Sequence, residues 1–215
     1  VKDGYAVLRN ALAPDGLREA DRARLARFEP GQAVAPDGEG RAVLEAAAGL
    51  IFRDIALRPL RAVLDDLPVC IRVAAARGIE QGFRQPSTAE ALPSPAECLA
   101  VIAATGEAGL TLDIVRGSHA LPEFTADGRS RWVEAGGGAA QELALAQGLS
   151  VEQVELGAED LAIVGPGTLH RLRSAAGIGG LRAHVVPRRV TPLRYLAGTG
   201  GTFSLRHPTG AMLAA

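Results

Sequence analysis

The side chains of this chain best suited to metal or acid–base chemistry are its four histidines, His119, His170, His184 and His207. None of them begins a His-X-Asp or His-X-Glu pair. A metal site would therefore need donors from separate segments to converge, such as His170 with His184 or His119 and a carboxylate such as Asp113 or Glu90.

Ser118 and His119 are adjacent, which raises the question of a nucleophilic Ser-His pair. Neighbouring residues on an extended chain point away from each other and rarely act as such a pair. We therefore assign Gly117, Ser118 and His119 to a structural turn.

Composition limits the classes of partner. The formal net charge is -1, with 47% hydrophobic and 22% charged residues. This balance gives no electrostatic reason to expect nucleic acid or an anionic membrane as partner. No run approaches the roughly 18 apolar residues of a membrane helix, and the first residues do not resemble a secretory signal. We expect cytoplasmic synthesis without membrane insertion, with incorporation into an assembled particle as an open alternative.

Hydrophobic spacing changes character along the chain. In the first third of the chain apolar residues recur at helical spacing, with Pro14 near the start of the first helical segment. From Val69 on, apolar and other residues alternate, and the segments are short and bounded by turn residues. Predicted helices cover 17–28, 42–57, 59–67 (broken from the previous one at Pro59) and 139–147 within a long insertion over 124–148. Predicted strands cover 5–8, 69–80, 98–104, 110–115, 151–156, 160–164 and 181–187.

This order of elements predicts a mainly β fold with flanking helices, a helix-backed jelly roll, rather than alternating βαβ units. A chain of 215 residues can bury one large core. We therefore expect one domain over 1–215, with a helix-rich part (1–68), jelly-roll strands (69–190) and an extended C-terminal tail (191–215).

Three segments resemble the phytanoyl-CoA dioxygenase family of iron(II) and 2-oxoglutarate enzymes. The first is Asp3-Gly-Tyr-Ala-Val-Leu-Arg-Asn-Ala-Leu-Ala-Pro-Asp15. The second runs from Cys98 to Leu121 and ends in Arg116-Gly-Ser-His-Ala-Leu121, which is like the family's Pro-Gly-Ser-His signature with Arg116 in place of the proline. The third is Val154-Glu-Leu-Gly-Ala-Glu-Asp-Leu-Ala-Ile163, followed by Leu169-His170 and Leu181-Arg182. The resemblance implies a double-stranded β-helix (jelly roll, cupin-like). It also implies that His170 is the distal metal ligand and Arg182 the arginine that binds 2-oxoglutarate.

The sequence departs from this family where the metal-binding His-X-Asp pair should lie. Phe83-Arg-Gln-Pro-Ser87 occupies that place, so Arg84, Gln85 and Pro86 replace the pair. Arginine has no free lone pair for a cation and would repel it, and proline offers no side-chain ligand. We therefore predict a degenerate member that binds no metal and no cofactor and is not an enzyme. His170, Arg182, Arg84 and Gln85 would line a vestigial pocket able to hold an anion.

The function predicted on this basis is a catalytically inactive structural or binding module. A place in an oligomeric particle, spike or surface attachment apparatus fits by analogy with other jelly rolls. Two alternatives stay open: an active iron(II)/2-oxoglutarate hydroxylase with an atypical metal site, and a carboxylate-binding sensor. A small carboxylate or a saccharide is the candidate ligand, although an aromatic content of 4% disfavours a sugar groove.

The C-terminal segment from Leu196 to Ala215 is apolar and glycine-rich and lacks helical or alternating spacing. Such tails are ordered mainly when they dock on a neighbour, so we expect a homo-oligomer or another subunit to bind it. Deleting 197–215 should lower the sedimentation coefficient by breaking the assembly. An unchanged coefficient would refute this prediction.

Overall fold

The computed structural model describes residues 2–12, 54–80, 82–86, 97–104, 110–121, 142, 145–190, 205–206 and 212–213. The predicted helix over 17–28 lies outside these residues. So do most of the predicted helix over 42–57 and most of the insertion over 124–148.

Within the described chain the main element is an antiparallel sheet in the order β1-β6-β3-β7-β4-β5, with β2 pairing with β7 as well. The strands are β1 (Tyr5–Leu8), β2 (Pro68–Ile79), β3 (Leu99–Ala104), β4 (Leu110–Val115), β5 (Val151–Leu156), β6 (Leu161–Val164) and β7 (His170–Pro187). Six of these match predicted strands to within a residue or two. The mainly β jelly-roll fold is confirmed.

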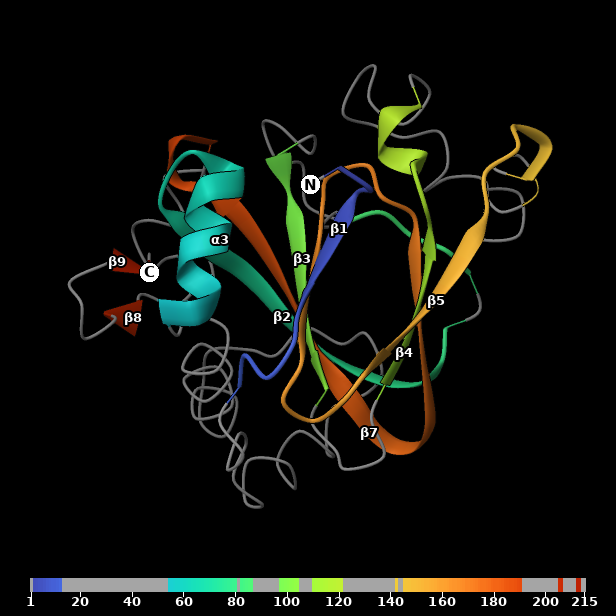
Figure 1. The fold of residues 1–215 in the computed structure, drawn as a ribbon. Coiled ribbons are helices and arrows are strands. Elements are labelled where there is room, and N and C mark those ends of the chain that lie inside the picture. The colour runs from blue at the N-terminus through green and yellow to red at the C-terminus, as the bar shows by residue number, and fades with distance from the viewer. Residues whose placement is uncertain are drawn as a thin grey trace.

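Strand β7 closes the jelly roll, because it pairs with both halves of the sheet. Its first arm pairs with β4 through His170–Arg173, and its second arm pairs with β3 through Gly180–Val185. In Figure 1 the orange β7 bends between these arms, so that β4 and β5 face β1, β3 and β6. A Cβ on Gly180 would lie 2.6 Å from the Ala103 carbonyl oxygen. The bend therefore uses glycine where two backbones approach closely.

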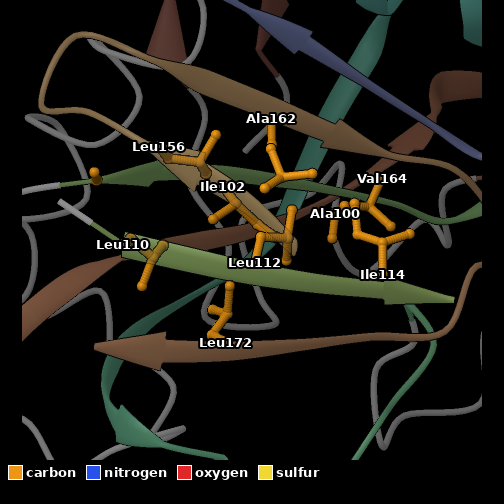
Figure 2. Packing of buried hydrophobic residues seen from close by; sticks show 11 residues of the cluster. Ala100, Ile102, Leu110, Leu112, Ile114, Leu156, Ala162, Val164 and Leu172 are labelled. Atoms are coloured by element: carbon orange, nitrogen blue, oxygen red, sulfur yellow. The ribbon is translucent and has the colours of Figure 1, made fainter. Parts of the chain in front are cut away.

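The core lies between the two halves of the folded sheet. Figure 2 shows apolar side chains from β3, β4, β5, β6 and β7 pointing toward one another. On each of these strands alternate residues face inward, as the period of a β-strand requires. The cluster consists of Ala100, Ile102, Ala104, Leu110, Leu112, Ile114, Val154, Leu156, Ala162, Val164 and Leu172.

Helix α3 (Asp54–Leu64) runs through Pro59, so the predicted break at that residue is wrong. Proline removes one backbone hydrogen bond and usually kinks or ends a helix. Here the helix continues because one side of it is an apolar stripe: Ala56, Leu57, Leu60 and Leu64 are all buried. Packing of that stripe outweighs the local preference. In Figure 1 the cyan helix lies beside β2.

Strand β7 begins at His170 rather than at the predicted 181. The segment before 181 contains Ser174-Ala-Ala-Gly-Ile-Gly-Gly180, which has the composition of a loop and no apolar alternation. The strand continues through it because β2 pairs with Ile178 and Gly180, and β2 and β4 pair with Arg173 before it, with register shifts near Arg77. A tertiary pairing therefore decided the local structure.

The described parts of the C-terminal segment form a short pair, β8 (Leu205–Arg206) with β9 (Met212–Leu213). The prediction that this segment binds another subunit stays a prediction. Among the described helices there is none whose length and apolarity would let it span a membrane.

Packing between the two halves of the sheet should dominate stability. Leu112 is fully buried in the cluster, whereas Leu145 is 51% exposed. We expect Leu112→Ala to lower the free energy of unfolding by about 2–5 kcal/mol, because it leaves a cavity. The matched control Leu145→Ala should change it by no more than about 0.5 kcal/mol. Urea denaturation followed by circular dichroism measures both, and equal losses would contradict the assigned core.

Candidate functional site

Polar side chains from both arms of β7 face the apolar interior: His170 from the first arm, and Arg182 and His184, which lies opposite Ala100, from the second. Directly opposite residues of an antiparallel pair lie on the same face of a sheet. His170 is opposite Ile114, and Arg182 is opposite Ile102, and both isoleucines belong to the core cluster. The fold of β7 therefore brings an imidazole and a guanidinium into the same interior.

Arg182 binds a carboxylate there with both of its terminal nitrogens. Its Nη1 donates to Oε1 of Glu80 and its Nη2 donates to Oε2, each at 2.8 Å. The side chains are 4% and 13% exposed. Two parallel, charge-assisted hydrogen bonds of this kind are the strongest way in which arginine holds a carboxylate. Glu80 follows the last residue of β2, so the end of that strand delivers the carboxylate.

The Glu80 carboxyl stays ionised in spite of its burial. Burial alone would raise its pKa, but the hydrogen bonds and charge of Arg182 outweigh that effect. The charge of Arg84 and the backbone N–H of Leu172, which donates to Oε2 at 2.9 Å, lower the pKa further. The net result is a pKa below the usual value for glutamate, so the pair is an ion pair at neutral pH.

His170 is fully buried and electrically neutral. Its Nδ1 lies 3.2 Å from the carbonyl oxygen of Thr168, and since a carbonyl can only accept, Nδ1 carries the proton. Nε2 is then an acceptor, and among the described residues it has no hydrogen-bond partner. Burial, reinforced by the positive charge of Arg182, lowers the pKa of His170 to about 3.

The predicted pocket residues Arg84 and Gln85 lie next to His170. Arg84 and His170 exchange two backbone hydrogen bonds of 2.9 Å, and Arg84 Nη2 lies 3.6 Å from Oε1 of Glu80. Gln85 donates from Nε2 to the carbonyl oxygen of Gly167 at 3.2 Å. Gln85 thus fixes the turn that leads into His170, and Arg84 is a second, half-exposed arginine beside Glu80.

The turn at Gly117, Ser118 and His119 supports the same end of β7. Gly117 has a φ of 81°, in the left-handed region that glycine adopts without strain. The Ser118 hydroxyl donates to the carbonyl of Val115 at 2.7 Å and accepts from the N–H of Leu169 at 2.9 Å. Ser118 therefore ties the start of β7 to the end of β4.

The described residues do not fit an iron site made of two histidines and one carboxylate. His170 offers one buried nitrogen lone pair, but the residue paired with it on the neighbouring segment is Arg84, which cannot bind a metal ion. Asp113 lies on the other face of β4, where Arg171 and Arg173 hold it, each at 2.7 Å. No group of three His, Cys, Asp or Glu side chains that could hold a metal ion occurs in the described part of the chain. Glu90 lies outside that part.

Sequence reasoning missed Glu80, which is the most strongly held acidic group of this interior. Its one signal is a charge at the end of an apolar strand, predicted over 69–80. That signal is weak, because strand ends are often polar and exposed. The partner, Arg182, is far away in sequence, and only the pairing of β2 with β7 brings the two together.

No protein-family model matches the chain, and no curated protein sequence matches it. Its fold does match solved structures. The epimerase SnoN of nogalamycin biosynthesis, solved with Fe3+, alpha-ketoglutarate and nogalamycin RO, covers 86% of this chain and 80% of its own at a TM-score of 0.63 and 16% identity. HygX from Streptomyces hygroscopicus, solved with nickel and 2-oxoglutarate, covers 87% and 83% at 0.54 and 13%. The nickel complex of the non-heme monooxygenase ThoJ covers 100% and 81% at 0.53 and 14%.

The fold is that of the iron and 2-oxoglutarate oxygenases. Two predictions from the sequence are therefore wrong: that the chain is not an enzyme, and that it uses no cofactor. Among the solved structures that share its fold, SnoN is described as a non-heme alpha-ketoglutarate-dependent epimerase and ThoJ as a non-heme monooxygenase. SnoN was solved with Fe3+ and alpha-ketoglutarate, and HygX with nickel and 2-oxoglutarate. The absence of a His-X-Asp pair excludes one arrangement of metal ligands. It does not exclude every enzymatic use of the interior, so it could not support the prediction of an inactive protein.

The neutral state of His170 should make the fold sensitive to acid. An unfolded histidine takes up its proton near pH 6.5, and His170 in the folded chain does so only near pH 3. Between these values the unfolded state binds the extra proton, so acid favours unfolding, with a slope approaching about 1.4 kcal/mol per pH unit. Glu80, whose pKa is lowered, adds a loss of stability at lower pH, below its ordinary pKa.

The variant His170→Asn keeps a donor toward Thr168 and removes the titrating group. We expect it to flatten the fall in unfolding free energy between pH 6 and pH 4.5, measured by denaturant titration at each pH. A slope equal to that of the wild type would show that His170 is not the buried neutral group.

Proposed function

We propose that this chain is an enzyme of the oxygenase fold that takes a small keto acid or dicarboxylate as substrate or co-substrate, bound through Arg182. The observation that carries the proposal is the bidentate hydrogen bonding of the buried Arg182 guanidinium to a carboxylate, which in this structure is that of Glu80. This geometry is available to any carboxylate of similar shape. We further propose kinship with the phytanoyl-CoA dioxygenase family, on the three segments given above.

The surroundings of Arg182 support a carboxylate rather than a neutral ligand. The residues opposite it on the neighbouring strands are Ala74 and Ile102, which offer no hydrogen bonds to a polar group. A guanidinium in apolar surroundings needs a negative partner, because an unpaired buried charge is costly. In this structure Glu80 is that partner, so a ligand that replaces it must also be negatively charged. Arg84, next to His170, adds a second positive charge at the same end of the interior.

The residues of the site can hold and orient such a ligand without further groups. Arg182 fixes the carboxylate, and the neutral His170 presents a buried lone pair at Nε2. Gln85 and Ser118 hold the turn and the strand that carry His170. SnoN and HygX were solved with Fe3+ or nickel bound, whereas the described side chains of this chain do not form a metal site.

The structural role in an oligomeric particle, predicted from the sequence, is independent of this site. It stays a prediction, and sedimentation of the chain with and without 197–215 tests it.

Binding of 2-oxoglutarate tests the proposal. We expect the wild-type chain to bind it in isothermal titration calorimetry, and Arg182→Lys to bind it at least about tenfold more weakly. Lysine keeps the positive charge but cannot make the bidentate pair of hydrogen bonds. The matched control is Arg116→Lys, a change at a surface arginine that pairs with Asp3. It should bind like the wild type.

Turnover tests the catalytic part. We expect the wild type to consume 2-oxoglutarate, followed by proton NMR with and without added Fe(II), and Arg182→Lys to consume it more slowly. Binding without consumption would contradict the enzymatic assignment. Equal binding by Arg182→Lys and the wild type would contradict the role of Arg182.

A further inference from the structure

The carboxylate on Arg182 in this structure belongs to the protein itself. Glu80 takes both terminal nitrogens of the guanidinium. Among the described residues no other acidic side chain is hydrogen-bonded to Arg182. A ligand carboxylate that uses the same two donors must therefore take the place of Glu80, because one guanidinium edge binds one carboxylate in this way.

The chain that carries Glu80 follows an irregular end of β2, with two register shifts within a few residues. The register of β2 against β7 shifts between Ala76 and Arg77 and again between Arg77 and Ile79. Gly78 between them has a φ of +61°, and no atom lies within 4 Å of the position that a Cβ would occupy. Ile79 is 65% exposed. The chain just before Glu80 is therefore exposed and has free space beside it.

A displaced Glu80 has a second arginine within reach. Arg84 Nη2 already lies 3.6 Å from Oε1 of Glu80, and its side chain is 49% exposed. Moving the carboxylate from Arg182 toward Arg84 keeps it paired with a cation and brings it closer to water. The main loss is the hydrogen bond from the N–H of Leu172 to Oε2, while the Glu80 N–H can keep its bond to the Leu172 carbonyl.

We propose that Glu80 is an internal competitor for the carboxylate position of Arg182, and that a keto acid or dicarboxylate binds there by displacing Glu80 toward Arg84. This inference rests on the proposed binding of a carboxylate by Arg182. It assigns Glu80 the role of setting the affinity of the site. When only the displaced fraction of molecules can bind, the apparent dissociation constant rises by the inverse of that fraction.

The deciding variant is Glu80→Gln, which keeps the shape of the side chain and removes its charge. We expect it to bind 2-oxoglutarate at least about tenfold more tightly than the wild type in isothermal titration calorimetry. The reason is that the state in which residue 80 occupies Arg182 loses its ion pair and becomes less populated. Glu80→Asp keeps the charge on a shorter side chain and should give an intermediate affinity. Thermal melting of each variant, followed by circular dichroism, shows that it is folded, and Glu80→Asp still decides the question if Glu80→Gln does not fold.

Asp113 provides a matched control. It too is a buried carboxylate held by arginines, Arg171 and Arg173, but on the other face of the sheet. Asp113→Asn should leave the affinity for 2-oxoglutarate at the wild-type value. An equal gain in Asp113→Asn and Glu80→Gln would overturn the proposal, since the effect would then be one of overall charge.

The outcomes separate this inference from the proposed function. If Arg182→Lys weakens binding but Glu80→Gln binds like the wild type or more weakly, Glu80 is not a competitor, and the role of Arg182 stands. If Glu80→Gln binds tightly and no 2-oxoglutarate is consumed, Glu80 is a competitor, and the enzymatic assignment fails. If neither the wild type nor folded Glu80→Gln binds, both are overturned.

Discussion

The pairing of β7 with both halves of the sheet is the constraint on which the rest of the structure depends. Because its two arms are hydrogen-bonded to β4 and to β3, one strand folds the sheet onto itself and encloses the apolar cluster. The same fold carries His170 and Arg182 into that cluster. Polar groups in an apolar interior must be neutral or paired, and these two meet the requirement in different ways. His170 is neutral, and Arg182 is paired with Glu80.

Much of the fold could be predicted from the sequence. Short apolar segments bounded by turn residues located β1, β3, β4, β5 and β6 closely. The part of β7 before residue 181 could not be predicted, since its glycine-rich middle has no apolar alternation, and it is a strand because β4 and β2 pair with it. The predicted break at Pro59 was wrong for a similar reason. The helix continues because Leu57, Leu60 and Leu64 are buried, which outweighs the local preference of proline.

The candidate site was predictable in part. The resemblance of short segments pointed to His170, Arg182 and Arg84. Arg182 and Arg84 lie beside the carboxylate of Glu80, and His170 is the backbone partner of Arg84. The carboxylate itself was not predictable. Glu80 and Arg182 meet because β2 lies along β7, and a single sequence gives no sign of which glutamate an arginine will bind. The missing His-X-Asp pair led to a conclusion about activity that the solved structures of similar fold contradict.

A crystal structure of the chain grown with saturating 2-oxoglutarate tests this account most directly. The account predicts a carboxylate of the keto acid on both terminal nitrogens of Arg182, with Glu80 turned toward Arg84. Glu80 still bound to Arg182, with the keto acid elsewhere or absent, would contradict it.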